Sequence, residues 1–391
     1  MNPLKIEMPE TKTHTGLFGE LASMYSDREI SDVQIRSGGL LYVHTSRGLE
    51  AVESLGIQQP GVVSQIAEAL FASQTEEVWA GIETPNTGEK MWTLVKERRV
   101  IDMSCEQGVL GSPVRMRVQI HLSEHGLGIT CRWLRAKISQ LESLGIEPMI
   151  ADSLRELIQR RFGLGLITGP TGSGKSTTLA ALLDWVRRNF QKHIVTIEDP
   201  IEYRYDSMME DPNQPGQQVY CPSLVTQQEV GRHTKSYQSG LKEVLRKAPH
   251  LILIGEIRDR QTMETCIEAA QTGHFVLSTL HTRGAVKTFD RILEFFPKEQ
   301  HSGILHRLGE TMTFVLSQGL LTGFAGRVLV TEYLQNTSEP VSSGIRAYDG
   351  SATSLADALR CKGNQRWDQS LMNLYREGHI PENVFNANLM G

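Results

Sequence analysis

Gly165-Leu-Ile-Thr-Gly-Pro-Thr-Gly-Ser-Gly-Lys-Ser-Thr177 is the stretch that decides the fold of this chain. It holds the pattern G-x-x-x-x-G-K-S between a short apolar run and residues 176–188, whose apolar side chains recur at helical spacing. A strand, a glycine-rich turn and a helix in this order are the context that a phosphate-binding loop requires. The simpler alternative is a glycine-rich turn without a ligand, and the flanking strand and helix argue against it.

The residue types of this loop fit a nucleoside triphosphate with Mg²⁺. The glycines let backbone N–H groups turn toward a polyphosphate, and the N-terminus of the following helix favours negative charge. Lys175 supplies a cation for the β and γ phosphates, and the hydroxyl of Ser176 is a magnesium ligand. The predicted cofactors are therefore ATP and Mg²⁺. The predicted phosphate-binding residues are Gly169, Pro170, Thr171, Gly172, Ser173, Gly174, Lys175, Ser176 and Thr177.

Length and composition indicate a globular protein of two domains. The chain has 391 residues, more than one hydrophobic core usually serves, and a formal net charge of −5. This charge argues against a surface built mainly for nucleic acid or for an anionic membrane. No apolar run approaches the ~20 residues that cross a bilayer, and the start of the chain lacks the apolar stretch of a signal peptide, so we expect a cytoplasmic protein. Five scattered cysteines without a C-x-x-C pair support neither a zinc site nor a disulfide framework.

The first domain is predicted to be α+β and to span residues 1–137. Residues 32–36 and 40–44 alternate like a hairpin, residues 114–121 and 127–133 form a second strand pair, and residues 60–73 form a helix. A linker is predicted over residues 138–150, where glycine and proline interrupt the pattern.

The second domain is predicted over residues 151–391 and belongs to the α/β class. Ser153 and Glu156 resemble a capping box that starts a helix ending near Arg161. Apolar runs alternate with helical stretches, which predicts a mostly parallel sheet covered on both faces. The predicted strands are 163–168, 193–197, 251–255 and 275–280. After residue 303 we expect mainly helix, with a β-like stretch over 327–334 and a last helix over 369–377, and residues 206–223 form an exposed loop.

Acidic residues follow two of these predicted strands. Glu256 comes directly after the strand 251–255, where a carboxylate can polarise the water that attacks the γ phosphate. Glu198, Asp199 and Glu202 follow the strand 193–197. Because open α/β sheets bind ligands at the carboxyl ends of their strands, we expect both sets to meet the phosphate loop. The predicted magnesium ligands are Ser176, Glu198, Asp199 and Glu202, and the alternative for Glu256 is a surface acid after a core strand.

Histidines and arginines complete the set of candidates. His281 follows the strand 275–280, where an imidazole can sense the γ phosphate, whereas His274 precedes the strand and serves either structure or function.

Arg115 and Arg117 share one face of a strand, and Arg132 lies on the next. A solvated basic face is the default interpretation. The functional interpretation is that these arginines close over the triphosphate when the domains approach. Further candidates are Arg258, Arg260 and Arg291.

Four boxes in this order resemble the secretion and pilus traffic ATPases of the PilT/GspE superfamily. They are a Walker A motif (169–177), an Asp box (196–202), a Walker B motif with its following Arg-Asp (251–259) and a His box (273–282). The resemblance implies a PAS-like N-terminal domain, a flexible linker, a RecA-like ATPase domain and a homohexamer in which ATP closes one domain on the other. It implies that Glu256 is the catalytic glutamate, Glu202 the Asp-box acid near Mg²⁺ and His281 the His-box residue.

Within this superfamily, residues 245–256 and 365–371 resemble the DotB/TraJ-type type IVB secretion ATPases more than pilus retraction motors. Ala248-Pro249-His250 stands where the pilus motors usually carry Asp-Pro-Asp, and His125 stands where they carry an arginine. The resemblance therefore implies a motor recruited to the cytoplasmic face of an inner-membrane secretion or conjugation complex, without membrane insertion or direct nucleic-acid binding. Pilus retraction is the first alternative, and a RecA-like nucleic-acid motor or an ATP-binding scaffold without turnover are the others.

Overall fold

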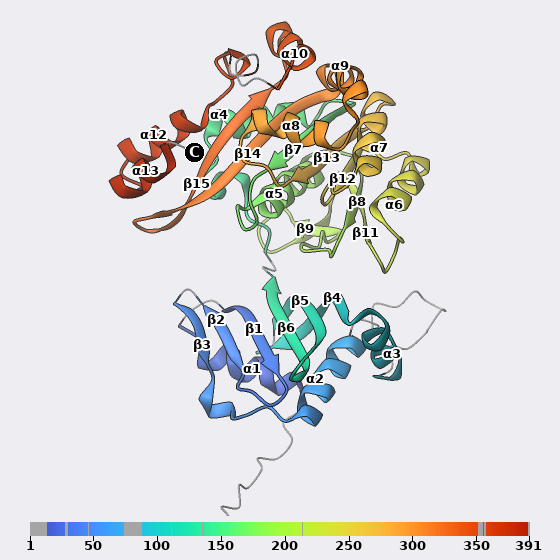
Figure 1. Cartoon of the computed structure of the whole chain (residues 1–391), viewed down its shortest axis with the longest axis vertical. Coiled ribbons are helices and arrows are strands. Elements are labelled where there is room, and N and C mark those ends of the chain that lie inside the picture. Colours follow the sequence, from blue (N-terminus) through green and yellow to red (C-terminus); the bar gives the residue numbers. More distant parts are fainter. Residues whose placement is uncertain are drawn as a thin grey trace, which may run out of the picture. The chain divides into compact units, whose positions relative to one another are not determined.

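The computed structural model describes residues 14–27, 30–45, 47–73, 88–110, 112–134, 137–212, 214–350, 355 and 357–389. The chain forms two compact units, Met1–Lys137 and Ile138–Gly391, and we describe each by itself (Figure 1). The first 13 residues, on which the expectation about a signal peptide depends, lie outside the described residues.

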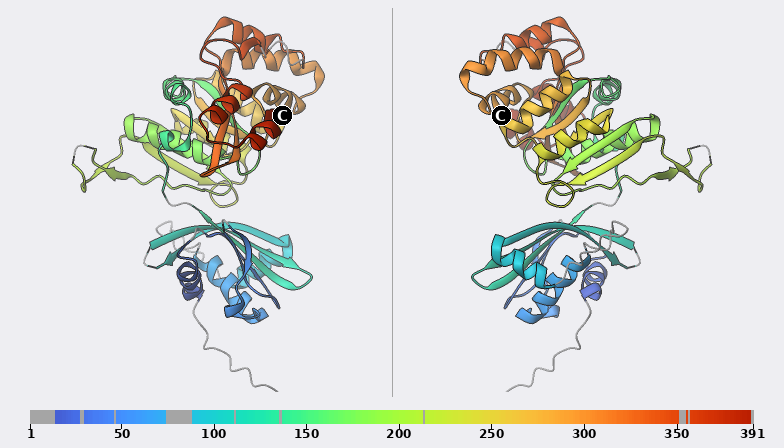
Figure 2. Two further views of the ribbon diagram at one scale, coloured as in Figure 1. Left: turned by 90° about the vertical axis from the view of Figure 1, so that its left-hand side faces the viewer. Right: turned by 90° about the vertical axis from the view of Figure 1, so that its right-hand side faces the viewer.

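The first unit is a six-stranded antiparallel sheet in the order β3-β2-β1-β6-β5-β4. Three helices lie against one face of the sheet (Figure 2). Both predicted strand pairs and the predicted helix over 60–73 are confirmed. The elements are β1 Ile30–Arg36, β2 Tyr42–Thr45, β3 Gly48–Ala51, β4 Val100–Val109, β5 Ser112–Ser123, β6 Gly126–Leu134, α1 His14–Met24, α2 Pro60–Ser73, α3 Gly88–Arg98 and the 3-10 turn η1 Glu53–Leu55.

Alternation along β5 shows why this sheet has two different faces. Met116, Val118 and Ile120 are fully buried in the core beneath the helices. The residues that alternate with them, including Arg115 and Arg117, point to the opposite face, because successive side chains of a strand alternate. The sequence therefore dictates one apolar face and one polar face.

The second unit is built on a seven-stranded sheet in the order β11-β8-β12-β13-β7-β14-β15. Every neighbouring pair is parallel except β14 with β15, so the predicted α/β class with a mostly parallel sheet is confirmed. The strands are β7 Gly163–Thr168, β8 His193–Glu198, β11 Leu224–Glu229, β12 Leu251–Ile254, β13 Phe275–Leu280, β14 Met312–Gly323 and β15 Gly326–Gln335. The described helices are α4 Pro148–Leu157, α5 Lys175–Asn189, α6 Tyr237–Val244, α7 Arg260–Gln271, α8 Ala285–Glu294, α9 His301–Thr311, α10 Glu339–Arg346, α12 Trp367–Arg376 and α13 Glu382–Leu389, with the 3-10 turns η2 Leu141–Leu144, η3 Leu245–Lys247 and η4 Lys298–Gln300.

Helices cover both faces of this sheet, and each face has its own core. On one face, α4 and α5 pack on side chains such as Phe314 and Leu316 of β14. On the other, α6 to α10 pack on a second cluster that includes Val315 of the same strand. Strands buried on both faces are continuous apolar runs, which is the pattern that predicted them.

Four details of the second unit differ from the sequence predictions. The chain after residue 303 is less helical than expected, because Met312–Gly323 forms the strand β14. Helix α4 starts at Pro148, with proline at its first position, so the capping box predicted at Ser153 is wrong. Helix α13 follows the helix that was predicted to be the last. The predicted loop over 206–223 carries a two-stranded sheet of β9 Met208–Glu210 and β10 Gln218–Tyr220.

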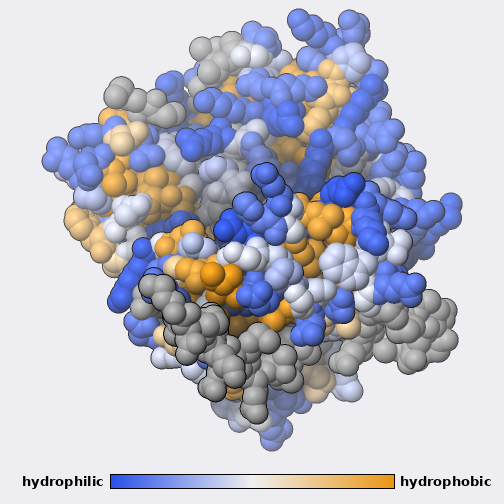
Figure 3. All heavy atoms as spheres, turned by 60° about the horizontal axis from the view of Figure 1, so that its bottom comes forward, coloured by the Kyte–Doolittle hydropathy of each residue, from blue (hydrophilic) through white to orange (hydrophobic). Residues whose placement is uncertain are grey.

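The segment predicted as a linker, 138–150, carries η2 and the first turn of α4. Its residues Leu141 and Ile146 are buried in the same core as α5. Within the described ranges, the helices are too short or too polar to span a bilayer. On the face drawn in Figure 3, hydrophobic residues form separate patches between hydrophilic ones.

Candidate nucleotide site

The glycine-rich loop follows β7 and leads directly into α5. Gly169, Gly172 and Gly174 all have positive φ angles, of 145°, 78° and 90°, which side chains of L-residues rarely adopt. A Cβ atom on Gly169 would collide with the carbonyl oxygen of Gln318 and with Oγ of Ser173, whereas one on Gly172 or Gly174 would meet open space. The glycines therefore shape a loop that ends on a helix N-terminus, the arrangement that binds phosphate.

Lys175 is folded back onto this loop. Its Nζ donates hydrogen bonds to the carbonyl oxygens of Gly169 and Pro170, at 2.9 and 3.0 Å. Burial lowers the pKa of Lys175, and the negative charges of Glu256 and Glu202 act in the opposite direction. Glu256 and Glu202 are thus close enough to influence the lysine electrostatically, as expected for acids at the carboxyl ends of neighbouring strands.

Glu256 lies between two cationic or potentially cationic side chains. Its Oε2 accepts a hydrogen bond from Nε of Arg258 at 3.0 Å, and its Oε1 lies 3.1 Å from Nε2 of His281. Arg258 also reaches Asp199, with 3.5 Å between Nη1 and Oδ2. The glutamate side chain is 21% exposed, so it remains open to water while both of its oxygens are held. The carboxyl ends of β8, β12 and β13 therefore converge on one charged cluster.

Tyr237 of α6 borders this cluster, and the sequence analysis did not identify it. Burial, followed by the negative charge of Asp199, raises the pKa of its hydroxyl. A Cβ atom on Gly255 would lie 3.1 Å from that hydroxyl. The glycine that precedes Glu256 thus leaves room for a tyrosine that stays protonated.

The other Asp-box residues have separate contacts. Glu198 accepts hydrogen bonds from Thr196 and Gln227, at 2.7 and 3.1 Å. The hydroxyl of Tyr203 lies 3.1 Å from Oγ1 of Thr177 and so joins the residue after Glu202 to the first turn of α5. These contacts fix the loop between β8 and the hairpin beside the phosphate loop.

The residues present fit a magnesium ion bound mainly through phosphates. No group of three or more histidine, cysteine, aspartate or glutamate side chains in the described residues is placed to hold a metal. Magnesium at phosphate sites usually keeps several waters and takes one or two protein ligands. The hydroxyl of Ser176 on the loop and the carboxylate of Glu202, whose charge acts on Lys175, match that requirement.

The buried side of the loop is formed by β14. Nε2 of Gln318 donates a hydrogen bond of 2.9 Å to Oγ1 of Thr178 in the first turn of α5. The preceding residue, Ser317, accepts one of 2.8 Å from the N–H of Gly284, just after the His box. Because neighbouring residues of a strand point to opposite faces, β14 touches both loops of the site. This strand was not predicted, so sequence reasoning missed both residues.

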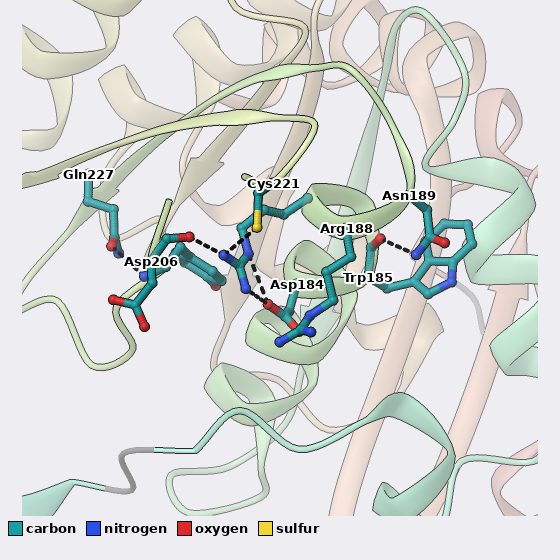
Figure 4. A network of polar contacts seen from close by, with 9 residues as sticks. Asp184, Trp185, Arg188, Asn189, Asp206, Cys221 and Gln227 are labelled. Carbon is teal, nitrogen blue, oxygen red and sulfur yellow. Dashed lines mark hydrogen bonds and ion pairs between the residues drawn. The ribbon is translucent and has the colours of Figure 1, made fainter. Parts of the chain in front are cut away.

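The far end of α5 anchors the hairpin β9–β10 (Figure 4). Arg187, which is 4% exposed, forms an ion pair of 2.6 Å with Asp184 and donates hydrogen bonds to the carbonyl oxygen of Asp206 and to Sγ of Cys221. Asp184 also pairs with Arg188, at 2.6 Å. The helix that begins at Lys175 therefore ends on the base of the segment 206–223.

The three candidate arginines of the first unit, Arg115, Arg117 and Arg132, lie on the face of the sheet opposite its helices. Arg117 stands directly opposite Arg132 in the β5–β6 register. Arg132 donates a hydrogen bond of 2.8 Å to Asp32, and Arg115, 8% exposed, donates one of 3.4 Å to Ser104. They thus share one polar face, as predicted for Arg115 and Arg117.

The remaining candidates lie away from the phosphate loop or make other contacts. His274 precedes β13, at the opposite end of the strand from the site, and its Nδ1 lies 3.3 Å from the carbonyl oxygen of Ala269. Arg260 contacts Gln300, and Arg291 contacts Glu294. These contacts favour a structural role for all three.

The fold and this site define a P-loop ATPase. The chain belongs to the type II/IV secretion system protein family, whose model matches residues 94–365. The type IV pilus retraction ATPase PilT of Pseudomonas aeruginosa is 35% identical over 269 residues, 68% of this chain and 73% of that protein.

Two solved structures are similar over nearly the whole chain. The crystal structure of the pilus retraction motor PilT with bound ADP has a TM-score of 0.77 at 30% identity, over 94% of this chain and 96% of that chain. The structure of the ATPase DotB of Legionella pneumophila has a TM-score of 0.76 at 25% identity, over 99% of this chain and 98% of that chain. The predicted superfamily and ATPase activity are therefore confirmed.

Proposed function

We propose that this chain is the homohexameric ATPase that powers a type IVB secretion or conjugation machine from the cytoplasmic face of the inner membrane. The observation that carries the proposal is the similarity to DotB, which extends over 99% of this chain, against 94% for the PilT structure. The stretches 245–256 and 365–371, which resemble the DotB/TraJ-type ATPases, support the same choice.

In the proposed mechanism, Glu256 accepts a proton from the water that attacks the γ phosphate. Arg258 and His281 hold the two carboxylate oxygens and so fix the direction of the acid. Lys175 exchanges its two carbonyl partners for the β and γ phosphates, because charged phosphate oxygens are stronger acceptors. When bound, Mg²⁺ would neutralise developing charge, and Ser176 and Glu202 would hold it.

The first unit contributes arginines in this proposal. Arg115, Arg117 and Arg132 share one polar face, and Arg117 stands opposite Arg132. Like charges at paired positions of a sheet destabilise it unless an anion or acid compensates, and Asp32 compensates only Arg132 by a hydrogen bond. We propose that the triphosphate is the anion that this face receives on domain closure, and that its hydrolysis releases the face again.

The cellular test is deletion of the gene, followed by complementation with the parent, with Glu256→Gln or with Glu264→Gln, a partly exposed acid on α7. The proposal predicts that transfer of DNA or protein to recipient cells is lost on deletion. The parent and Glu264→Gln restore it, whereas Glu256→Gln does not, and surface filaments keep their normal number. Normal transfer in the deletion strain would contradict the proposal.

Pilus retraction is the second candidate, because PilT of Pseudomonas aeruginosa is 35% identical and the PilT structure with bound ADP has a slightly higher TM-score than the DotB structure. It predicts a different result in the same strain. Filaments that can no longer be withdrawn would accumulate on the surface, and transfer would continue. Counting filaments by electron microscopy in the deletion strain therefore decides between the two functions.

A further inference from the structure

Two buried polar atoms beneath the phosphate loop have no hydrogen-bond partner among the described residues. They are Oγ of Ser173, in a residue only 2% exposed, and Oε1 of Gln318, in a residue 1% exposed. Leaving such an atom unsatisfied destabilises the folded protein. Nearly all buried polar groups in folded proteins are hydrogen-bonded, so two unpaired polar atoms close to the same loop indicate a function.

The two residues lie on the same side of the loop. A Cβ atom placed on Gly169 would collide both with Oγ of Ser173 and with the backbone carbonyl of Gln318. The Gln318 side chain points toward α5, since its Nε2 bonds Thr178. Ser173 immediately precedes Gly174, the N-cap of that helix. The missing side chain of Gly169 thus leaves both Oγ of Ser173 and the backbone of β14 close to the same point.

We propose that Gln318 is a positioning residue for nucleotide binding, which acts by accepting a hydrogen bond from Ser173 when the phosphate loop closes on its ligand. The side-chain amide has a donor nitrogen with two N–H groups and an acceptor oxygen with two lone pairs. Its donor already holds Thr178 and so fixes the first turn of α5. Its oxygen is left for the hydroxyl of Ser173, which approaches it as the backbone N–H groups of the loop take up phosphates.

Strand β14 makes this contact selective for the bound state. The strand is held between β7 and β15, so Gln318 is a fixed point against which the loop moves. A contact made only with nucleotide present adds to affinity without adding to the stability of the free protein. The pair therefore sets how tightly nucleotide is held, and it takes no part in the transfer of the γ phosphate.

The test is a double-mutant cycle on the full-length protein with ADP as the probe. Ser173→Ala is expected to weaken ADP binding about five- to tenfold, the effect of one buried hydrogen bond. It leaves the melting temperature of the nucleotide-free protein unchanged or slightly higher, because the hydroxyl it removes is unsatisfied there. In a Gln318→Met background, Ser173→Ala has no further effect on ADP binding.

Ser37→Ala is the matched control, since this buried hydroxyl of the first unit donates a hydrogen bond of 2.8 Å to the carbonyl oxygen of Leu127 and belongs to none of the four boxes. It is expected to lower the melting temperature and to leave ADP affinity unchanged. The inference rests on nucleotide binding at this loop, so a parent protein that binds no ADP would overturn both. With ADP bound by the parent, unchanged affinity in Ser173→Ala, or additive effects of the two substitutions, would overturn this inference alone.

Discussion

The phosphate loop has two sides of opposite character. Its open side carries charges, with Glu256 held between Arg258 and His281 and partly exposed to water. Its buried side carries neutral dipoles from β14, with Gln318 bonded to Thr178. Charges near water can exchange partners at low cost, whereas buried dipoles cannot, because each lost hydrogen bond leaves an unsatisfied group. The open side is therefore suited to chemistry and the buried side to holding geometry.

The largest expected effect is on the open side. Glu256→Gln keeps the shape of the side chain but removes the proton acceptor, so the rate of ATP hydrolysis should fall about 10²-fold or more. The measurement is phosphate release at saturating ATP, and Glu264→Gln on α7 is the matched control. Hydrolysis at the parental rate would show that the acid of the site lies elsewhere.

Lys175→Ala is expected to have the next largest effect, which is on nucleotide binding. A charge-assisted hydrogen bond contributes about 1.5–3 kcal/mol, so ADP affinity should fall about 10- to 150-fold. Titration calorimetry measures it, with the exposed Lys298→Ala as the control. An affinity equal to that of the parent would mean that the lysine keeps its carbonyl partners and makes no contact with phosphate.

Arg258→Ala tests whether Arg258 on the open side contributes to hydrolysis or to nucleotide binding. It frees Oε2 of Glu256 and removes the link to Asp199, so the acid loses its fixed direction. We expect hydrolysis to slow about 10-fold, since small misplacements of a reacting group are costly, while ADP affinity changes little. Arg258→Lys keeps the charge without the planar fork and should recover only part of the rate. A variant faster than the parent would instead identify Arg258 as a brake on Glu256.

Glu202→Gln tests the electrostatics of the loop lysine and should have a smaller effect. The pKa of Lys175 lies below its ordinary value of 10.5, and the charge of Glu202 opposes that shift. Without this charge the pKa falls further, so the lysine loses its proton at a lower pH. The ADP affinity of the variant, measured in metal-free buffer from pH 7 to pH 10, should therefore decline at a lower pH than that of the parent. Superimposable profiles would contradict the coupling.

The smallest effect is expected at Glu332 of β15, on the buried side. Its carboxylate accepts hydrogen bonds from the N–H groups of Ala285 and Trp367, at the starts of α8 and α12, and burial raises its pKa above 4.5. Between 4.5 and that raised value, the folded protein keeps a proton that the unfolded chain has released, so stability falls as the pH rises.

Glu332→Gln lacks this titration. The free energy of unfolding of the variant should therefore gain on that of the parent as the pH rises from 4 to 8, as measured by urea unfolding. Parallel curves for the two proteins would show that the carboxylate is not destabilised by its burial.

The open side could be predicted from the sequence, and the buried side could not. Strands β7 and β13 have the predicted bounds, because short apolar runs between glycines and helical patterns have few alternatives. Because open α/β sheets bind ligands at the carboxyl ends of their strands, Glu256 and His281 could be placed near the loop before the fold was known in detail.

Strand β14 was missed for a physical reason. Its sequence, Met312–Gly323, is buried on both faces, so it shows no alternation that distinguishes a strand from a buried helix. The polar residues Ser317 and Gln318 also interrupt its apolar run. They are buried because they bond Gly284 and Thr178, and such distant partners cannot be recognised from the local sequence. The same holds for Ser153, whose hydroxyl contacts Tyr333 and Gln335 instead of capping a helix.

The most direct test of the two-sided loop is to measure ADP affinity and the single-turnover rate of bound ATP for Glu256→Gln and Gln318→Met side by side. We expect Glu256→Gln to hydrolyse ATP more slowly with unchanged ADP affinity, and Gln318→Met to bind ADP more weakly with an unchanged single-turnover rate. Loss of the same quantity in both variants would contradict this expectation.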